Sequence, residues 1–128
     1  MVSYRTPLSR ARGLGSAKHG VGQWISERLS AIALVPLVLW GVFGALRLAA
    51  TDYYGAVAWI GQPLNATLMV LTIAISFLHM HAGLRVVLED YIHISLNKVA
   101  LLLINLFVCS LFGALAVFSI LKVALQGA

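Results

Sequence analysis

Long apolar stretches separated by short polar ones dominate the pattern of this chain. They cover about residues 24–50, 64–90 and 96–123. Each is long enough to cross the hydrocarbon core of a bilayer as a helix, which takes about 20 residues. A short chain in lipid has no other way to satisfy its backbone hydrogen bonds. The pattern therefore predicts an all-α integral membrane fold, with three transmembrane helices in a single domain over residues 1–128.

The composition agrees with a lipid environment. Hydrophobic residues make up 61% of the chain and charged residues only 10%, and the mean hydropathy is +0.95. A soluble domain typically has about a quarter of its residues charged. Because this chain could not cover a water-exposed surface, we expect the lipid bilayer to be its main surroundings.

Positive charge is concentrated at the N-terminal end. The formal net charge is +5, and five basic residues precede or open the first apolar stretch: Arg5, Arg10, Arg12, Lys18 and Arg28. Beside a membrane span, a basic tail more often sets topology than binds nucleic acid, so no nucleic-acid partner is expected. Residues 1–23, rich in Gly, Ser, Arg and Lys, are expected to form an extended cytoplasmic arm.

Small and aromatic residues predict local contacts. Two pairs of small residues four apart, Gly41 with Ala45 and Ser110 with Ala114, predict close helix packing. Residues 51–63 are expected to be a short polar connection. Its aromatic side chains are interpreted as anchors at the membrane interface, where such residues gather; they are Tyr53, Tyr54 and Trp59.

The stretch from His79 to His93 carries the main concentration of reactive side chains. His79 and His81 lie at membrane depth, and Asp90 and Tyr91 follow where the apolar run ends. Ionisable groups in hydrocarbon are costly and usually face a cofactor, a partner or water. His79 and Asp90 are eleven positions apart. That spacing is about three helical turns, so both lie on one helix face.

The residues alone leave alternatives open for this stretch. His79 could be a buried neutral histidine bonded to a neighbouring helix, and Asp90 with Tyr91 could be an ordinary polar helix end. Gly83, one turn after His79, lacks a Cβ and so leaves room for a large flat group near that face.

The same stretch resembles a known family. His79, Gly83 and then Glu89-Asp90-Tyr91 are similar to the second transmembrane helix of the small cytochrome b membrane-anchor subunit of bacterial succinate:quinone oxidoreductase, respiratory complex II. Three N-terminal motifs also resemble bacterial members: Arg5-Thr6-Pro7-Leu8, Arg12-Gly13-Leu14-Gly15-Ser16-Ala17-Lys18 and Glu27-Arg28-Leu29-Ser30-Ala31. The resemblance covers most of the chain from Arg5 to about Tyr91. The third apolar stretch matches only in kind.

The resemblance implies a haem b site and a ubiquinone site. His79 matches the axial haem ligand, the only metal ligand expected from this chain, and a partner chain supplies the second ligand. Arg28 pairs with a haem propionate, since a guanidinium fork suits a carboxylate. Asp90 and Tyr91 line the ubiquinone pocket, where the Tyr91 hydroxyl can donate to a quinone carbonyl. No residue of this chain is expected to be catalytic.

Some of these roles have competitors. His81 lies about 200° around the helix from His79, so the two cannot ligate one iron from the same side. We interpret His81 as a helix contact or a group at the haem periphery. Arg28 could instead be a basic anchor that reaches the lipid headgroups. Ser26 and Arg85 are possible helpers of Arg28, and Arg85 could equally be a cytoplasmic anchor.

The electron supply must lie in other subunits. The sequence has no dinucleotide fingerprint, and the single Cys109 cannot hold an iron–sulfur cluster. The resemblance implies three partners: a flavoprotein that oxidises succinate, an iron–sulfur protein and a second cytochrome b anchor. The chain would then be the hydrophobic membrane anchor of succinate dehydrogenase, supporting electron transfer from succinate to quinone.

Other functions compete with this hypothesis. They are the anchor of a related quinol:fumarate reductase, a structural assembly subunit without cofactor, and a small proton-coupled transporter that uses His79 and Asp90. An acidic residue in the middle of a span would favour the transporter, and the sequence has none.

The distribution of basic residues predicts the orientation. Seven lie before the first span or around the second loop, against Arg47 and Lys122 elsewhere. Cytoplasmic loops carry the excess of Lys and Arg. We therefore expect a multi-pass protein of the bacterial inner membrane, with the N-terminus and residues 89–97 in the cytoplasm and the C-terminus in the periplasm.

Overall fold

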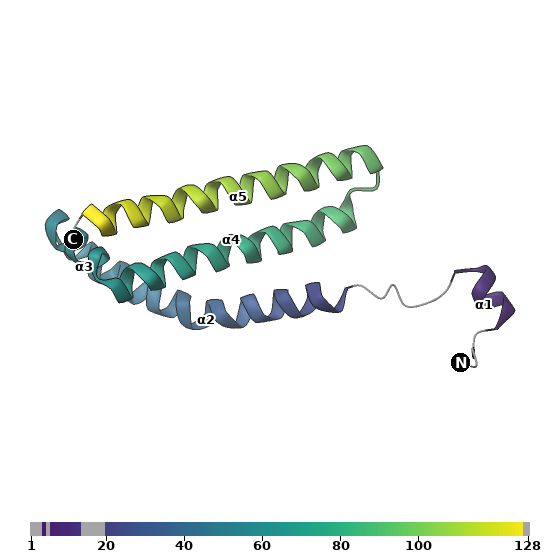
Figure 1. Ribbon diagram of the computed structural model, residues 1–128, viewed down its shortest axis with the longest axis horizontal. Coiled ribbons are helices and arrows are strands. Elements are labelled where there is room, and N and C mark those ends of the chain that lie inside the picture. Colours follow the sequence, from purple (N-terminus) through teal and green to yellow (C-terminus); the bar gives the residue numbers. More distant parts are fainter. Residues whose placement is uncertain (1–3, 5, 14–19, 127–128) are drawn as a thin grey trace.

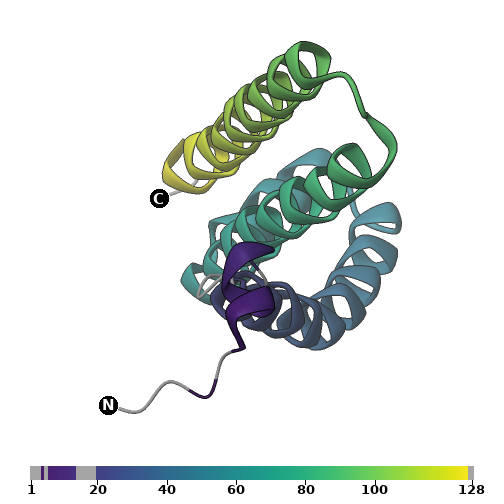
Figure 2. The same ribbon diagram turned by 90° about the vertical axis from the view of Figure 1, so that its right-hand side faces the viewer.

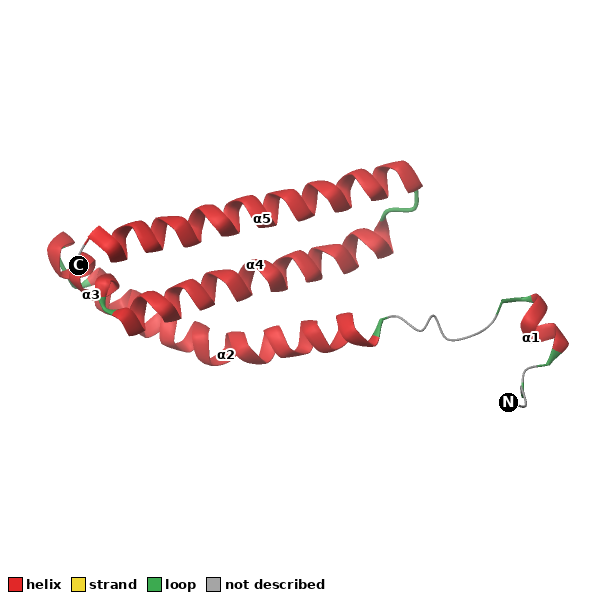
Figure 3. Cartoon of the chain, in the orientation of Figure 1, coloured by secondary structure: helices red, strands yellow, loops and turns green. Residues whose placement is uncertain are grey.

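The protein is a set of helices, seen in a computed structural model that describes Tyr4, residues 6–13 and residues 20–126. Every regular element among these residues is a helix (Figures 1 and 3). In chain order they are α1 (Pro7–Ala11), α2 (Val21–Ala49), α3 (Tyr53–Gly61), α4 (Pro63–Tyr91) and α5 (Ser95–Gln126).

Three of the helices, α2, α4 and α5, are long and apolar enough to cross a membrane. The predicted all-α fold with three such helices is therefore confirmed. α4 lies between the other two and packs against both, as the view along the helices shows (Figure 2). The first residues of α2, the end of α4 and the start of α5 lie at one end of the bundle (Figure 1). The C-terminal end of α5 lies at the other.

The arm contains a short helix that the sequence analysis did not predict. α1 begins where Thr6 caps it, because the Thr6 hydroxyl oxygen accepts a hydrogen bond from the Ser9 backbone N–H at 3.1 Å. Pro7 occupies the first turn, where its missing N–H removes no helical bond. The arm is thus not wholly extended. Arg5 and residues 14–19 of the family motifs lie outside the described residues.

The connection between the first two long helices is also helical, which corrects the expectation of a plain polar loop. α3 begins after Asp52, whose side-chain oxygen accepts a hydrogen bond from the Gly55 N–H at 3.0 Å. Trp59 of α3 stacks on Trp40 of α2, with ring centroids 5.8 Å apart. Trp59 is therefore a packing residue that ties α3 to α2, whereas Tyr53 and Tyr54 are exposed.

Two buried glycines lie in close contact with large rings, and neither belongs to the small-residue pairs named from the sequence. A Cβ on Gly44 would lie 3.0 Å from the Trp59 ring, and one on Gly113 would lie 3.2 Å from Cγ of Phe77. A Cβ on Gly41 would meet nothing within 4 Å. The contact in α2 thus lies at Gly44 instead of the predicted pair, because the large Trp59 ring reaches the helix there.

Candidate functional site

His79 lies at the junction of α4 and α2. Its Nδ1 is 2.9 Å from Oγ of Ser30 on α2. The Ser30 hydroxyl also donates to the Glu27 backbone carbonyl, at 2.9 Å. His79 lines a pocket of about 430 Å³ whose other walls are apolar residues of α2: Ala31, Leu34, Val35, Val38 and Leu39.

The surroundings of His79 fit a large apolar cofactor. Nδ1 is occupied by Ser30, and Nε2 has no hydrogen-bond partner among the described residues. Gly83, one turn on, would meet nothing within 4 Å if it carried a Cβ. One ring nitrogen is therefore available as a ligand, beside apolar walls and an open position on the helix.

The described residues do not form a metal site by themselves around His79. Within the described ranges, no group of three or more His, Cys, Asp or Glu side chains could together hold a metal ion. A haem would need fewer protein ligands, because the porphyrin nitrogens already bind the iron, so a single imidazole from this chain fits that group.

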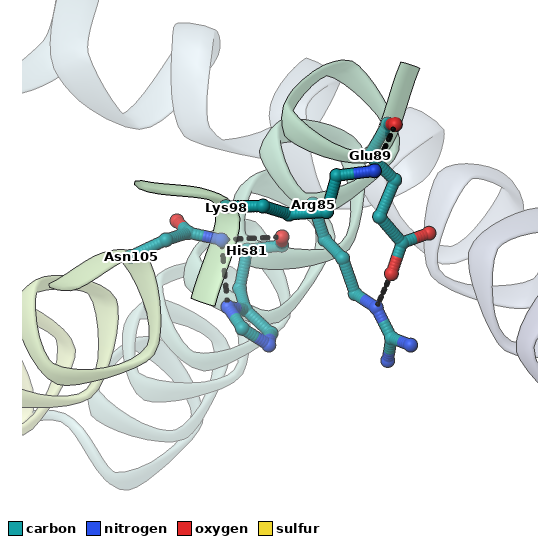
Figure 4. A network of polar contacts seen from close by, with 5 residues as sticks. All are labelled: His81, Arg85, Glu89, Lys98 and Asn105. Carbon is teal, nitrogen blue, oxygen red and sulfur yellow. Dashed lines mark hydrogen bonds and ion pairs between the residues drawn. The ribbon is translucent and has the colours of Figure 1, made fainter. Parts of the chain in front are cut away.

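His81 contacts α5 on one side and, on the other, lines a pocket of about 570 Å³ between α4 and α2. The Asn105 side-chain amide nitrogen lies 3.1 Å from His81 Nδ1 and 3.1 Å from the His81 backbone carbonyl (Figure 4). Asn105 is buried, with 7% of its surface exposed. The Cys109 thiol donates to the Asn105 carbonyl oxygen at 3.3 Å. His81 is therefore a contact between α4 and α5, one of the two roles expected for it.

Arg28 lies on the exposed surface near the start of α2. Its guanidinium carbon is 5.5 Å above the ring of Trp24. The described part of the chain shows no ion pair for it. Ser26, a possible helper, lines the same pocket of about 570 Å³ as His81, between α2 and α4. Arg85, the other, is paired with Glu89 at 2.7 Å (Figure 4). The structure thus does not bring Arg28 and these helpers together around one group.

Asp90 and Tyr91 form the last turn of α4. Both are exposed, Tyr91 to 77%. The backbone beside them is held: Lys98 of α5 donates to the Glu89 carbonyl at 3.0 Å (Figure 4), and His93 Nδ1 lies 3.1 Å from the Tyr91 carbonyl. The helix end is therefore anchored while the carboxylate and phenol face outward.

The two predicted sites are separate places on one helix. Asp90 follows His79 by eleven positions of α4, which corresponds to roughly 16 Å along the axis. A group held by His79 and a group held by Tyr91 can therefore be distinct molecules.

The sequence analysis did not identify two residues that contact the histidines, Ser30 and Asn105. Both are polar side chains inside apolar spans, a signal that often marks buried hydrogen bonding or function. The signal was available, but it does not say which histidine each would meet.

The chain is similar in sequence to several known proteins. Three similar proteins are each named "Succinate dehydrogenase hydrophobic membrane anchor subunit". The one from Rickettsia bellii is 33% identical and covers 74% of both chains. That from Rickettsia conorii is 29% identical, over 84% of this chain and 86% of the relative. That from Paracoccus denitrificans is 27% identical, over 97% and 95%.

No solved structure matches this chain significantly. The family model described as "Succinate dehydrogenase/Fumarate reductase transmembrane subunit" matches residues 2–121, which is nearly the whole chain. The three membrane-length helices agree with that description. The chain therefore belongs to the succinate dehydrogenase/fumarate reductase transmembrane subunit family.

Proposed function

We propose that this chain is the hydrophobic membrane anchor of a bacterial succinate dehydrogenase, and that it helps to bind haem b and ubiquinone. The observation that carries the haem part is the state of His79: one ring nitrogen is tied to Ser30 and the other lacks a partner among the described residues, beside the open position at Gly83. The names of the relatives favour succinate dehydrogenase over the related fumarate reductase.

His79 would hold the haem from one side through its free nitrogen. A haem b supplies one-electron redox chemistry when bound. The apolar pocket lined by His79 and the α2 residues would exclude water from one edge of the group. Arg28 is exposed, lies over the Trp24 ring and makes no ion pair among the described residues, so its guanidinium could bond a propionate. A second imidazole ligand would come from a partner anchor subunit.

Asp90 and Tyr91 would bind the quinone head at the aqueous end of α4. The Tyr91 hydroxyl can donate to one quinone carbonyl. Asp90 can orient a basic group of a partner or polarise a water. Quinone reduction takes up two electrons and two protons, so a site at the membrane surface gives both a soluble electron donor and water close access.

The exposed surface suits a subunit of a larger assembly. Large apolar side chains on all three long helices remain more than half exposed, for example Phe43, Leu78 and Phe118. In the membrane they would contact lipid and a second anchor subunit. The iron–sulfur subunit would dock at the end of the bundle that carries Tyr91, and the flavoprotein would be held through it.

The haem ligand is tested in the purified complex by a reduced-minus-oxidised visible spectrum. His79→Ala should abolish or strongly change the b-type signal, because it removes an axial ligand. His81→Ala is the matched control, two positions away and at similar depth, and should keep bis-histidine ligation. Subunit content is measured in parallel, since the complex can assemble without haem. The reverse pattern would show that His81 is the ligand.

A further inference from the structure

We infer that the two membrane histidines have opposite tautomers: Ser30 fixes the proton of His79 on Nδ1, and Asn105 fixes that of His81 on Nε2. Ser30 and Asn105 are then the positioning residues that make His79, and not His81, able to bind a metal. This inference rests on the proposed haem role of His79, and it adds the residues that select it.

The Ser30 hydroxyl determines the proton position of His79. A hydroxyl carries one proton. The Glu27 backbone carbonyl, 2.9 Å away, can only accept, so the hydroxyl proton points at it. The Ser30 oxygen must then accept from His79, whose Nδ1 is 2.9 Å away. His79 therefore carries its proton on Nδ1, and the lone pair of Nε2 is free.

The Asn105 amide determines the proton position of His81 in the opposite sense. The amide group that faces the His81 backbone carbonyl at 3.1 Å must be the NH₂ end, because a carbonyl cannot donate. The thiol of Cys109, which donates to the other end, agrees with this orientation. The same NH₂ group lies 3.1 Å from His81 Nδ1, which must therefore accept. A neutral His81 then carries its proton on Nε2.

These tautomers make the two histidines chemically unequal. A haem iron takes the lone pair of a neutral imidazole nitrogen. His79 offers one on Nε2. In His81 the Nδ1 lone pair is used by Asn105, and Nε2 is protonated. Ligation by His81 would require the loss of a buried hydrogen bond of Asn105 as well as a proton shift, and leaving a buried donor unsatisfied is unfavourable.

The contact with Ser30 should also lower the midpoint potential of a haem bound by His79. A metal-binding histidine has a second ring nitrogen, whose N–H can donate a hydrogen bond to a neighbouring group. That bond fixes the orientation of the ring and raises the basicity of the nitrogen that binds the metal. A more basic ligand favours ferric over ferrous iron. Removal of the Ser30 hydroxyl should therefore raise the haem midpoint potential.

The tautomers themselves are measured by ¹⁵N nuclear magnetic resonance of the full chain in lipid bilayers, without haem, with histidine rings labelled. Loss of signals in His79→Ala and His81→Ala assigns the two rings. The expected result is a protonated Nδ1 with a bare Nε2 for His79, and the reverse for His81. The same tautomer on both rings, or the opposite assignment, would overturn the inference.

The role of Ser30 is tested in the assembled complex. Ser30→Ala should raise the midpoint potential of the b-type signal. In the chain without haem, it should also shift the His79 proton from Nδ1 toward a mixture of the two ring nitrogens. Ser30→Thr keeps the hydroxyl, so its midpoint potential and its His79 proton position should be those of the wild type. Ser119→Ala is the matched control, because the Ser119 hydroxyl likewise bonds a carbonyl of its own helix, Leu115, but meets no histidine of the described chain. An unchanged potential in Ser30→Ala, or an equal change in Ser119→Ala, would contradict the assignment.

The two proposals fail in different ways. If His79→Ala keeps the haem spectrum while the resonances show the stated tautomers, the haem role of His79 is wrong and the tautomer assignment holds. If His79→Ala removes the haem but Ser30→Ala leaves both the tautomer and the potential unchanged, the haem role holds and the selection by Ser30 is wrong.

Discussion

At the scale of single residues, the phenol of Tyr91 has the clearest expected effect on function. Its side chain is 77% exposed at the end of α4, on a helix end held by Lys98. Tyr91→Phe keeps the ring and removes one hydrogen-bond donor. We expect quinone binding to weaken by about 1 kcal/mol, roughly fivefold. The measurement is succinate-driven quinone reduction by the complex, with the affinity of a quinone-site inhibitor.

The selectivity of that effect separates a quinone role from general damage. Succinate oxidation with an artificial acceptor that takes electrons upstream should stay normal in Tyr91→Phe. Asp90→Asn should also slow quinone reduction, without loss of haem. Wild-type quinone reduction by both variants in a fully assembled complex would show that Asp90 and Tyr91 are only a helix end.

The sequence shows which side chains to consider but not which of them meet. The spacing of His79, Gly83 and Asp90 singled out one of two histidines, a choice that stays a prediction. The partners Ser30 and Asn105 lie 49 and 24 positions from their histidines. Such contacts depend on the rotation of each helix about its axis, and a hydrophobic span has nearly the same pattern on every face.

At the scale of helices, the packing of α4 on α5 depends on Gly113. A Cβ there would lie 3.2 Å from Cγ and 3.3 Å from Cβ of Phe77. Because the Phe77 Cβ cannot move by rotation of the ring, Gly113→Val should force the helices apart. We expect a loss of roughly 1–3 kcal/mol, typical of overpacking, measured as a lower thermal stability of the purified complex.

Gly41→Val is the matched control for this substitution. It places the same side chain in a membrane-length helix, but a Cβ there meets nothing within 4 Å in this chain. Its stability should be close to that of the wild type unless a partner subunit covers Gly41. Equal losses in both variants would show that valine disturbs the helices by itself, and that the Phe77 contact is not the cause.

The helices differ in how well the sequence predicts them. Long apolar runs define α2, α4 and α5, because lipid requires a helix wherever such a run is long enough. The short α1 and α3 depend on single capping contacts by Thr6 and Asp52. Such caps are weak signals in a sequence. The packing at Gly44 was missed because it depends on where the Trp59 ring lies, which small-residue spacing does not encode.

At the scale of the whole molecule, one chain makes only part of a core. The buried apolar residues among those described are Cys109 and Ala124, both on α5. Large side chains such as Leu46 and Leu125 are left 65% and 75% exposed. A protein in water would bury more, but lipid and partner helices can cover these faces. The sequence predicts this openness through its composition, whereas the shape of the partner surface depends on chains other than this one.

The orientation in the membrane is the last prediction. The first residues of α2, the end of α4 and the start of α5 lie together (Figure 1), and Arg28, Arg85 and Lys98 belong to these segments. Arg47 and Lys122 lie near the other ends of α2 and α5. Because basic residues are retained in the cytoplasm, we expect the Tyr91 end to face the cytoplasm and the C-terminus to face the periplasm.

Reporter fusions measure this directly. Alkaline phosphatase, active only in the periplasm, should be active when fused after Gln126, and inactive when inserted between α4 and α5 at Ile94. A fluorescent reporter that matures in the cytoplasm should give the reverse pattern. The proposed quinone site also needs this orientation, because in that proposal the iron–sulfur subunit docks at the Tyr91 end from the cytoplasm. A cytoplasmic C-terminus would contradict the predicted orientation, and a periplasmic reporter at Ile94 would contradict the proposed quinone site.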